Sequence, residues 1–154
     1  MNRRIFLKGT LAGSAMAAAV GAGLVTPGRV LAAWPKEAFQ AESVNSALDN
    51  LFGDTAMEAA DNINIKAPDI AENGAVVPIT VDTDMDGVES IAIISEKNPT
   101  PLTSHFKLAD NAHGFVSTRI KMGETSDVIA LVRANGTSYT ARKEVKVTIG
   151  GCGG

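Results

Sequence analysis

The chain has 154 residues, of which 45% are hydrophobic and 20% charged, and its formal net charge is −3. This length gives room for one modest domain, and the composition excludes wholesale disorder. A single cysteine excludes a scaffold held by disulfides within the chain.

The N-terminus carries an export signal. Arg3 and Arg4 begin an R-R-x-F-L-K motif that is followed by a Gly/Ala-rich apolar stretch, which is the address of the bacterial twin-arginine (Tat) system. A membrane anchor is the alternative, but glycines and a proline interrupt the stretch and would weaken a spanning helix. We therefore expect residues 1–33 to be cleaved, before Ala33 or Trp34, leaving a periplasmic protein with no membrane attachment.

The charge of the remaining chain is uneven. Without residues 1–33, which hold four basic and no acidic residues, ten basic residues face seventeen acidic ones, a net charge of −7. Residues 34–96 have two lysines and thirteen acids, and residues 97–154 have eight basic residues and four acids. This acidic balance argues against nucleic acid as a partner.

The first predicted element after the signal is one amphipathic helix over about residues 36–52, because apolar residues recur at helical spacing. Gly53 ends it, and the segment that follows is ambiguous between a short helix and a loop. Seven β-rich runs bounded by turn residues come next: 62–68, 74–82, 88–97, 104–110, 114–122, 126–134 and 138–150. Residues 34–149 are therefore predicted to form a mainly β domain, an antiparallel β-sandwich preceded by one helix.

Alternation and turn chemistry support the strands. In the last run, Val145, Val147 and Ile149 would share one face. Asn73-Gly74 and Asn135-Gly136 are predicted to form hairpin turns, because Asn and Gly tolerate positive φ. The segment 96–101, with its two prolines, is expected to end a strand in a rigid connection.

Few other residues suggest chemistry. His105 and His113 flank a predicted loop and are expected to be surface or loop histidines, since two histidines are too few for a zinc centre. The acidic segment 82–87 starts like a calcium loop but lacks the closing glutamate, so we expect a solvated hairpin tip. The sequence predicts no metal site and no cofactor.

The only cysteine, Cys152, lies between Gly150-Gly151 and Gly153-Gly154 at the C-terminus. Glycine has the widest backbone freedom, so residues 150–154 are predicted to form a flexible swinging arm. No base or cation adjoins the thiol to activate it. This pattern indicates a carrier, whose covalently attached cargo is processed by other proteins.

Two alternatives stay open. Two exposed Cys152 tails could form an intermolecular disulfide in an oxidising compartment, which would make the chain a secreted β-sandwich subunit with a structural bond. A thiol enzyme would need a base from elsewhere in the fold, and His105 or His113 are the only histidine candidates.

The chain resembles the SoxY family, the sulfur-carrying subunits of the bacterial thiosulfate-oxidising (Sox) system. The terminal GGCGG carries the resemblance, together with AENGAVVPITV, EKNPTPLTSHF and STRIKM. The resemblance implies an immunoglobulin-like sandwich, a heterodimer with SoxZ called SoxYZ, and attachment of the substrate at Cys152. It also implies that the chain is no enzyme itself, and docks transiently with the cytochrome SoxAX, the thiosulfohydrolase SoxB and a sulfur dehydrogenase.

The basic residues of the last predicted strand add a hypothesis about the cargo. Arg142, Lys143 and Lys146 could favour an anionic group carried on Cys152, although exposed charges have small effects.

Overall fold

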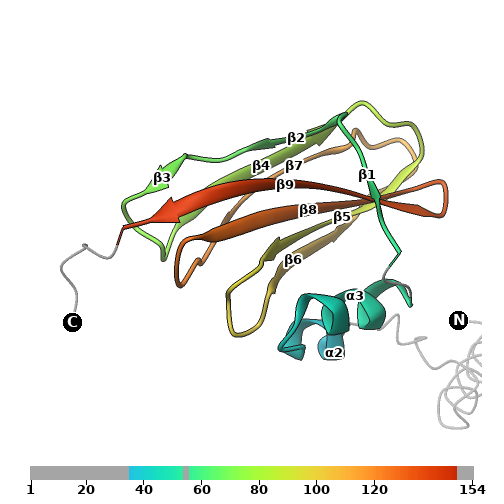
Figure 1. Ribbon diagram of the computed structural model, residues 1–154. Coiled ribbons are helices and arrows are strands. Elements are labelled where there is room, and N and C mark those ends of the chain that lie inside the picture. Colours follow the sequence, from blue (N-terminus) through green and yellow to red (C-terminus); the bar gives the residue numbers. More distant parts are fainter. Residues whose placement is uncertain (1–34, 54–55, 149–154) are drawn as a thin grey trace, which may run out of the picture. The chain divides into compact units, whose positions relative to one another are not determined.

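The computed structural model describes residues 35–53 and 56–148, and Figure 1 shows their arrangement. The predicted signal with Arg3 and Arg4 lies outside the described residues. The predicted arm, residues 150–154, lies outside them too, and so does Ile149.

Two short helices precede the strands, α2 (Lys36–Gln40) and α3 (Val44–Phe52). The prediction of one continuous helix was wrong, because Ala41 is extended and Ser43 caps a second helix, accepting a hydrogen bond from the Ser46 amide at 3.2 Å. Gly53 ends α3 in the left-handed conformation, as its position predicted. Neither of the described helices is long and apolar enough to cross a membrane.

The strands form two sheets, which Figure 1 shows stacked face to face. The larger sheet has the order β1-β9-β8-β5-β6, with β3 also paired to β9, and the smaller has the order β2-β4-β7. The strands are β1 (Glu58–Ala59), β2 (Ile63–Lys66), β3 (Ile70–Ala71), β4 (Val77–Thr83), β5 (Val88–Ser95), β6 (Leu102–Lys107), β7 (Phe115–Ile120), β8 (Ser126–Ala134) and β9 (Thr137–Val147). All seven predicted strands are present, and the mainly β sandwich fold is confirmed.

The long strand β9 departs from a purely antiparallel arrangement. One of its edges pairs with β8 from Thr137 to Val145, antiparallel. Its other edge pairs in parallel with two short strands that the sequence did not predict, β1 at Tyr139 and Thr140 and β3 at Lys146 and Val147. These additions cover part of an edge that would otherwise be open to another chain.

Two cores hold the domain together. The first lies between the sheets and includes Val77, Ile79, Ile91, Ile93 and Val145, all fully buried. The second lies between α2, α3 and the outer face of the larger sheet, where Leu48 packs with Ala92, Ile94, Ile129 and Leu131. The central strands β5 and β8 contribute to both cores, which explains why their sequences are continuously apolar rather than alternating.

The structure confirms some of the predicted turns and contradicts others. Asn135 and Gly136 both have positive φ, 50° and 77°, and connect β8 to β9 as predicted. Asn73-Gly74 is a turn between β3 and β4, which belong to different sheets, so the predicted hairpin there was wrong. The acidic segment 82–87 likewise crosses from β4 in one sheet to β5 in the other and is no hairpin tip. The segment 96–101 does connect β5 to β6, as predicted.

Candidate functional site

The predicted attachment residue Cys152, its glycine neighbours, and Arg3 and Arg4 all lie outside the described part of the chain. The candidate site is therefore approached from the place where β9 ends. We call this place the arm end. It comprises Thr148 and the connections 72–76, 96–101 and 121–125, which meet at one end of the sandwich (Figure 1). Any arm beginning at Ile149 starts from this surface.

The end of β9 is held on both edges. On the β3 side, the Lys146 amide donates to the Asp69 carbonyl at 3.0 Å and the Thr148 amide donates to the Ala71 carbonyl at 3.1 Å. On the β8 side, the Val147 amide donates to Thr125 Oγ1 at 2.9 Å. The backbone is therefore hydrogen-bonded through the last described residue.

Gly74 explains how the neighbouring turn packs so closely against this end. A Cβ at this position would lie 2.8 Å from Val147 Cγ1 and closer still to the Met122 carbonyl oxygen. The Met122 amide donates to the Gly74 carbonyl at 2.7 Å, which fixes the two segments together. Gly74 is therefore required for space and not for a positive φ.

Two of the three basic residues of β9 have carboxylate partners. Arg142 lies 3.1 Å from Glu96 and 3.7 Å from Asp127. Lys143 lies 3.2 Å from Asp69 and donates to the Ala67 carbonyl at 2.8 Å. Carboxylates already pair with these two cations, so the structure does not support their part of the hypothesis. Lys146, the third residue of the hypothesis, is exposed and has no ion pair among the described residues.

A groove at the arm end carries cations that the hypothesis missed. It has a volume of about 570 Å³ and lies along β6 and β7, the edge strands of the two sheets. Arg119 and Lys121 line it, both exposed, and neither has an ion pair within residues 35–53 and 56–148. Period-2 alternation around the buried Ile120 could have predicted that Arg119 and Lys121 share the outward face.

Asn98 fixes the geometry of this groove. Its side-chain amide donates to the Lys121 carbonyl at 2.7 Å, and its Oδ1 accepts from the Gly123 amide at 2.9 Å. These two bonds join the connection 96–101 to the connection 121–125. The walls of the groove are therefore held together by both of the polar atoms of one side chain.

The histidines differ from the expectation in one case. His113 is exposed in the connection before β7, as predicted. His105 lies within strand β6, half-buried, with its ring edge-on to Phe52 and with Nε2 unpaired among the described residues. Burial lowers the pKa of His105, and the charge of Lys107 lowers it further. A loop position for His105 was therefore wrong.

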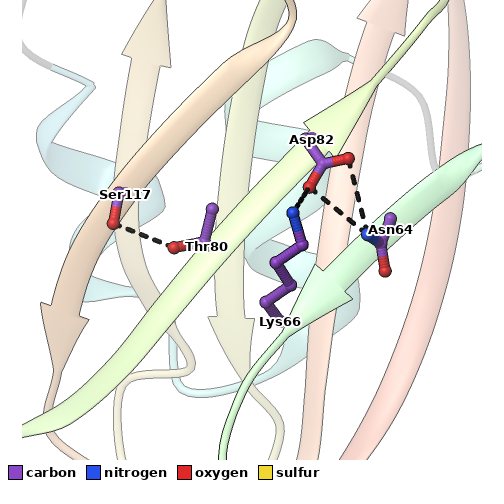
Figure 2. A network of polar contacts seen from close by, with 5 residues as sticks. All are labelled: Asn64, Lys66, Thr80, Asp82 and Ser117. Atoms are coloured by element: carbon purple, nitrogen blue, oxygen red, sulfur yellow. Dashed lines mark hydrogen bonds and ion pairs between the residues drawn. The ribbon is translucent and has the colours of Figure 1, made fainter.

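The acidic segment 82–87 begins in a polar network on the outer face of the smaller sheet (Figure 2). Asp82 lies 2.9 Å from Lys66 Nζ and also accepts from Asn64 on β2. Hydrogen bonding from Lys66 lowers the pKa of Asp82 below its usual range. A second contact in the same figure joins Thr80 to Ser117 at 2.9 Å, so these side chains link all three strands of this sheet.

The described residues include no cluster of three or more metal-ligating side chains.

A second groove, of about 330 Å³, lies at the other end of β6 and is lined by His105, Lys107, Arg133 and Glu89. There Arg133 lies 3.5 Å from Glu89 and over the Phe52 ring. In contrast to the groove at the arm end, its arginine is already paired with a carboxylate.

Comparisons with known proteins give a consistent result. The family model described as sulfur oxidation protein SoxY matches residues 48–152, a span that ends at Cys152. The sulfur carrier protein SoxY from Chlorobium limicola f thiosulfatophilum is 38% identical, with a TM-score of 0.64, covering 70% of this chain and 97% of that chain. No curated protein sequence matches significantly.

A second solved structure shows the fold alone. The superoxide reductase (neelaredoxin) from Ignicoccus hospitalis has a TM-score of 0.53 at 16% identity, covering 60% of this chain and 95% of that chain. At such low identity a shared sandwich carries no information about the site. The family match and the 38% identity are of a different kind, and on them the chain belongs to the SoxY family of sulfur oxidation proteins.

Proposed function

We propose that this chain is a covalent carrier of sulfur intermediates in thiosulfate oxidation, with the cargo attached to the thiol of Cys152. The observation that carries the proposal is the SoxY family match, which extends to Cys152, the only cysteine in the sequence. Its similarity to a protein described as a sulfur carrier supports the same role in the Sox system. The glycines on both sides of Cys152 suit a thin arm that enters narrow active sites.

The chemistry proceeds in two steps, each in a partner's active site. In the first, Cys152 Sγ and the outer sulfur of thiosulfate form an S–S bond, one proton leaves the thiol, and two electrons pass to a haem cytochrome, the proposed role of SoxAX. In the second, water attacks the sulfonate sulfur, the bond to the sulfane sulfur breaks, sulfate leaves and a persulfide stays on the arm. SoxB would catalyse this hydrolysis, and a sulfur dehydrogenase would oxidise the persulfide.

The other parts of the proposal follow from this role. The chain forms a heterodimer with SoxZ, acts in the periplasm after Tat export through Arg3 and Arg4, and has no catalytic activity of its own. The glycine neighbours of Cys152 supply no base or cation, so activation comes from the partner enzymes.

The first test is an intact-mass spectrum of the protein purified from cells that oxidise thiosulfate, recorded with and without reductant. Sulfur or thiosulfonate additions that disappear with reductant, and are absent in Cys152→Ser, are expected. A cargo-free dimer that dissociates with reductant would instead identify Cys152 as an intermolecular disulfide. Turnover of thiosulfate by the isolated chain would revive the thiol-enzyme alternative.

A further inference from the structure

The dipeptide Asn-Gly occurs twice in the chain, and the structure surrounds the two copies differently. The first is Asn73-Gly74, in the turn between β3 and β4, and the second is Asn135-Gly136, between β8 and β9. A glycine after asparagine favours cyclisation, because it has no Cβ to hinder attack by its amide nitrogen on the asparagine side chain. Both copies are therefore chemically able to react, and their surroundings decide which one does.

The reacting groups of Asn73-Gly74 are free. Asn73 is exposed, and its Nδ2, the leaving group, has no hydrogen-bond partner within residues 35–53 and 56–148. The Gly74 amide nitrogen, the attacking group, donates to no acceptor in the same residues. Asn73 Oδ1 accepts a hydrogen bond from the Ala75 amide at 3.0 Å. This donor is placed to stabilise the oxyanion that forms on Oδ1 when Cγ is attacked.

The same groups of Asn135-Gly136 are engaged. Asn135 Nδ2 donates to the Asp86 carbonyl at 2.9 Å, and the Gly136 amide donates to Glu89 Oε1 at 2.8 Å. A Cβ on Gly87 would collide with the Asn135 side chain, which therefore has little space to rotate on that side. The leaving group and the attacking nitrogen are bonded to different acceptors, so both bonds must break before the ring can close.

We propose that Asn73 is a site of spontaneous deamidation, and that the fold protects Asn135 from the same reaction. The Gly74 nitrogen loses its proton to solvent and bonds to Asn73 Cγ, the Cγ–Nδ2 bond breaks, and ammonia leaves with a proton from solvent. The product is a cyclic succinimide. Water then opens the ring, giving aspartate when it adds at Cγ and isoaspartate when it adds at the backbone carbonyl carbon. The reaction requires only water.

Isoaspartate at position 73 would alter the arm end. It adds a methylene group to the main chain and converts the Asn73 backbone carbonyl, which accepts from the Val76 amide at 3.3 Å, into a free carboxylate. Gly74 cannot shift freely to accommodate this change, because its carbonyl accepts from the Met122 amide and it lies close against Val147. The modification also adds one negative charge. We therefore expect the modified turn to hold the end of β9 less firmly.

The test is peptide mapping of the full chain, purified with any subunit that accompanies it. The protein is incubated at mildly alkaline pH, where the attacking nitrogen loses its proton more readily, in native buffer and in urea. Both sites are followed by mass spectrometry after proteolysis, and chromatography separates isoaspartate from aspartate. In urea the two sites should react at similar rates, because the chain is unfolded. In native buffer Asn73 should react about tenfold faster than Asn135, where two hydrogen bonds must break first.

Two variants make the test sharper. Glu89→Ala removes the acceptor of the Gly136 amide and should accelerate the reaction at Asn135 about three- to tenfold, with no change at Asn73. Circular dichroism verifies that this variant is folded. Asn73→Gln is the matched control for the consequence at β9, because its longer side chain would have to close a less favourable six-membered ring. Incubation should speed amide exchange at Val147 in the unsubstituted chain and not in Asn73→Gln.

The two parts of the proposal fail separately. Equal native rates at the two sites, a faster reaction at Asn135, or protection of both sites in native buffer relative to urea would overturn the assignment of Asn73. Unchanged exchange at Val147 after Asn73 has converted would overturn the consequence for β9 and leave the modification standing. The carrier function is tested independently, because the reaction involves neither Cys152 nor its cargo.

Discussion

Replacing Gly74 with alanine tests how rigidly the end of β9 is held. The new Cβ would lie 2.8 Å from Val147 Cγ1 and closer to the Met122 carbonyl, and Met122 is itself held in place because its amide donates a hydrogen bond to the Gly74 carbonyl. Overpacking of this kind costs about 1–3 kcal/mol, partly offset by about 0.4–1 kcal/mol from the lower entropy of the unfolded chain. We expect a net destabilisation of about 1–2 kcal/mol, which lowers the Tm by about 4–10 °C.

The assay is thermal and urea unfolding followed by circular dichroism, together with amide hydrogen exchange at Val147 and Thr148. Gly123→Ala is the control at the same end of the sandwich, since a Cβ there would lie 3.7 Å from Asn98 Oδ1, an ordinary contact. Its Tm should be unchanged or slightly higher. Equal Tm values for the two variants, with unchanged exchange at the end of β9, would refute the packing described here.

Three further predictions concern parts of the fold away from the arm end. Asn135→Ala should destabilise by about 1–2 kcal/mol in urea unfolding, because it loses a bond to the Asp86 carbonyl and strains a positive φ, whereas Asn135→Gly should cost less. Because the pKa of His105 is lower in the folded state, stability should fall as the pH drops below about 6.5; His105→Gln should flatten this part of the pH profile, and an unchanged profile would contradict it. Lys66→Met should raise the pKa of Asp82, measured by NMR titration of its carboxyl, since hydrogen bonding from Lys66 is the main cause of its lowering.

Strand positions were predictable from the sequence because each run has its own turn residues and apolar pattern. The two short strands β1 and β3 were not, since two residues carry no period, and their partner is a strand far along the chain. The break between α2 and α3 was missed because helical spacing continues across it, although Ser43 is a good N-cap. The runs of apolar residues in β5 and β8 did indicate that both faces of these strands are buried, since only strands covered on both faces need such runs.

The charges at the arm end show a second limit of prediction from the sequence. Arg142, Lys143 and Lys146 were the cations near Cys152 in sequence, but Glu96, Asp127 and Asp69 come from distant segments to pair with the first two. Only Lys146 of the three has no ion pair in the described residues. Arg119 and Lys121 lie farther away in sequence and are left unpaired in the described residues. The distribution of charge along a sequence therefore does not predict which charged side chains lack an ion pair in the fold, because pairing depends on contacts between strands.

The hydrogen bonding of β9 also has a mechanical consequence. Ladder bonds of an antiparallel pair run perpendicular to the strands, and β9 is bonded to β8 from Thr137 to Val145 and to β3 at its end. A pull on Thr148 along the strand axis would load these bonds together in shear, rather than open them one at a time. A partner that pulls on the C-terminus along this axis would thus transmit force to the larger sheet through β8 and β3.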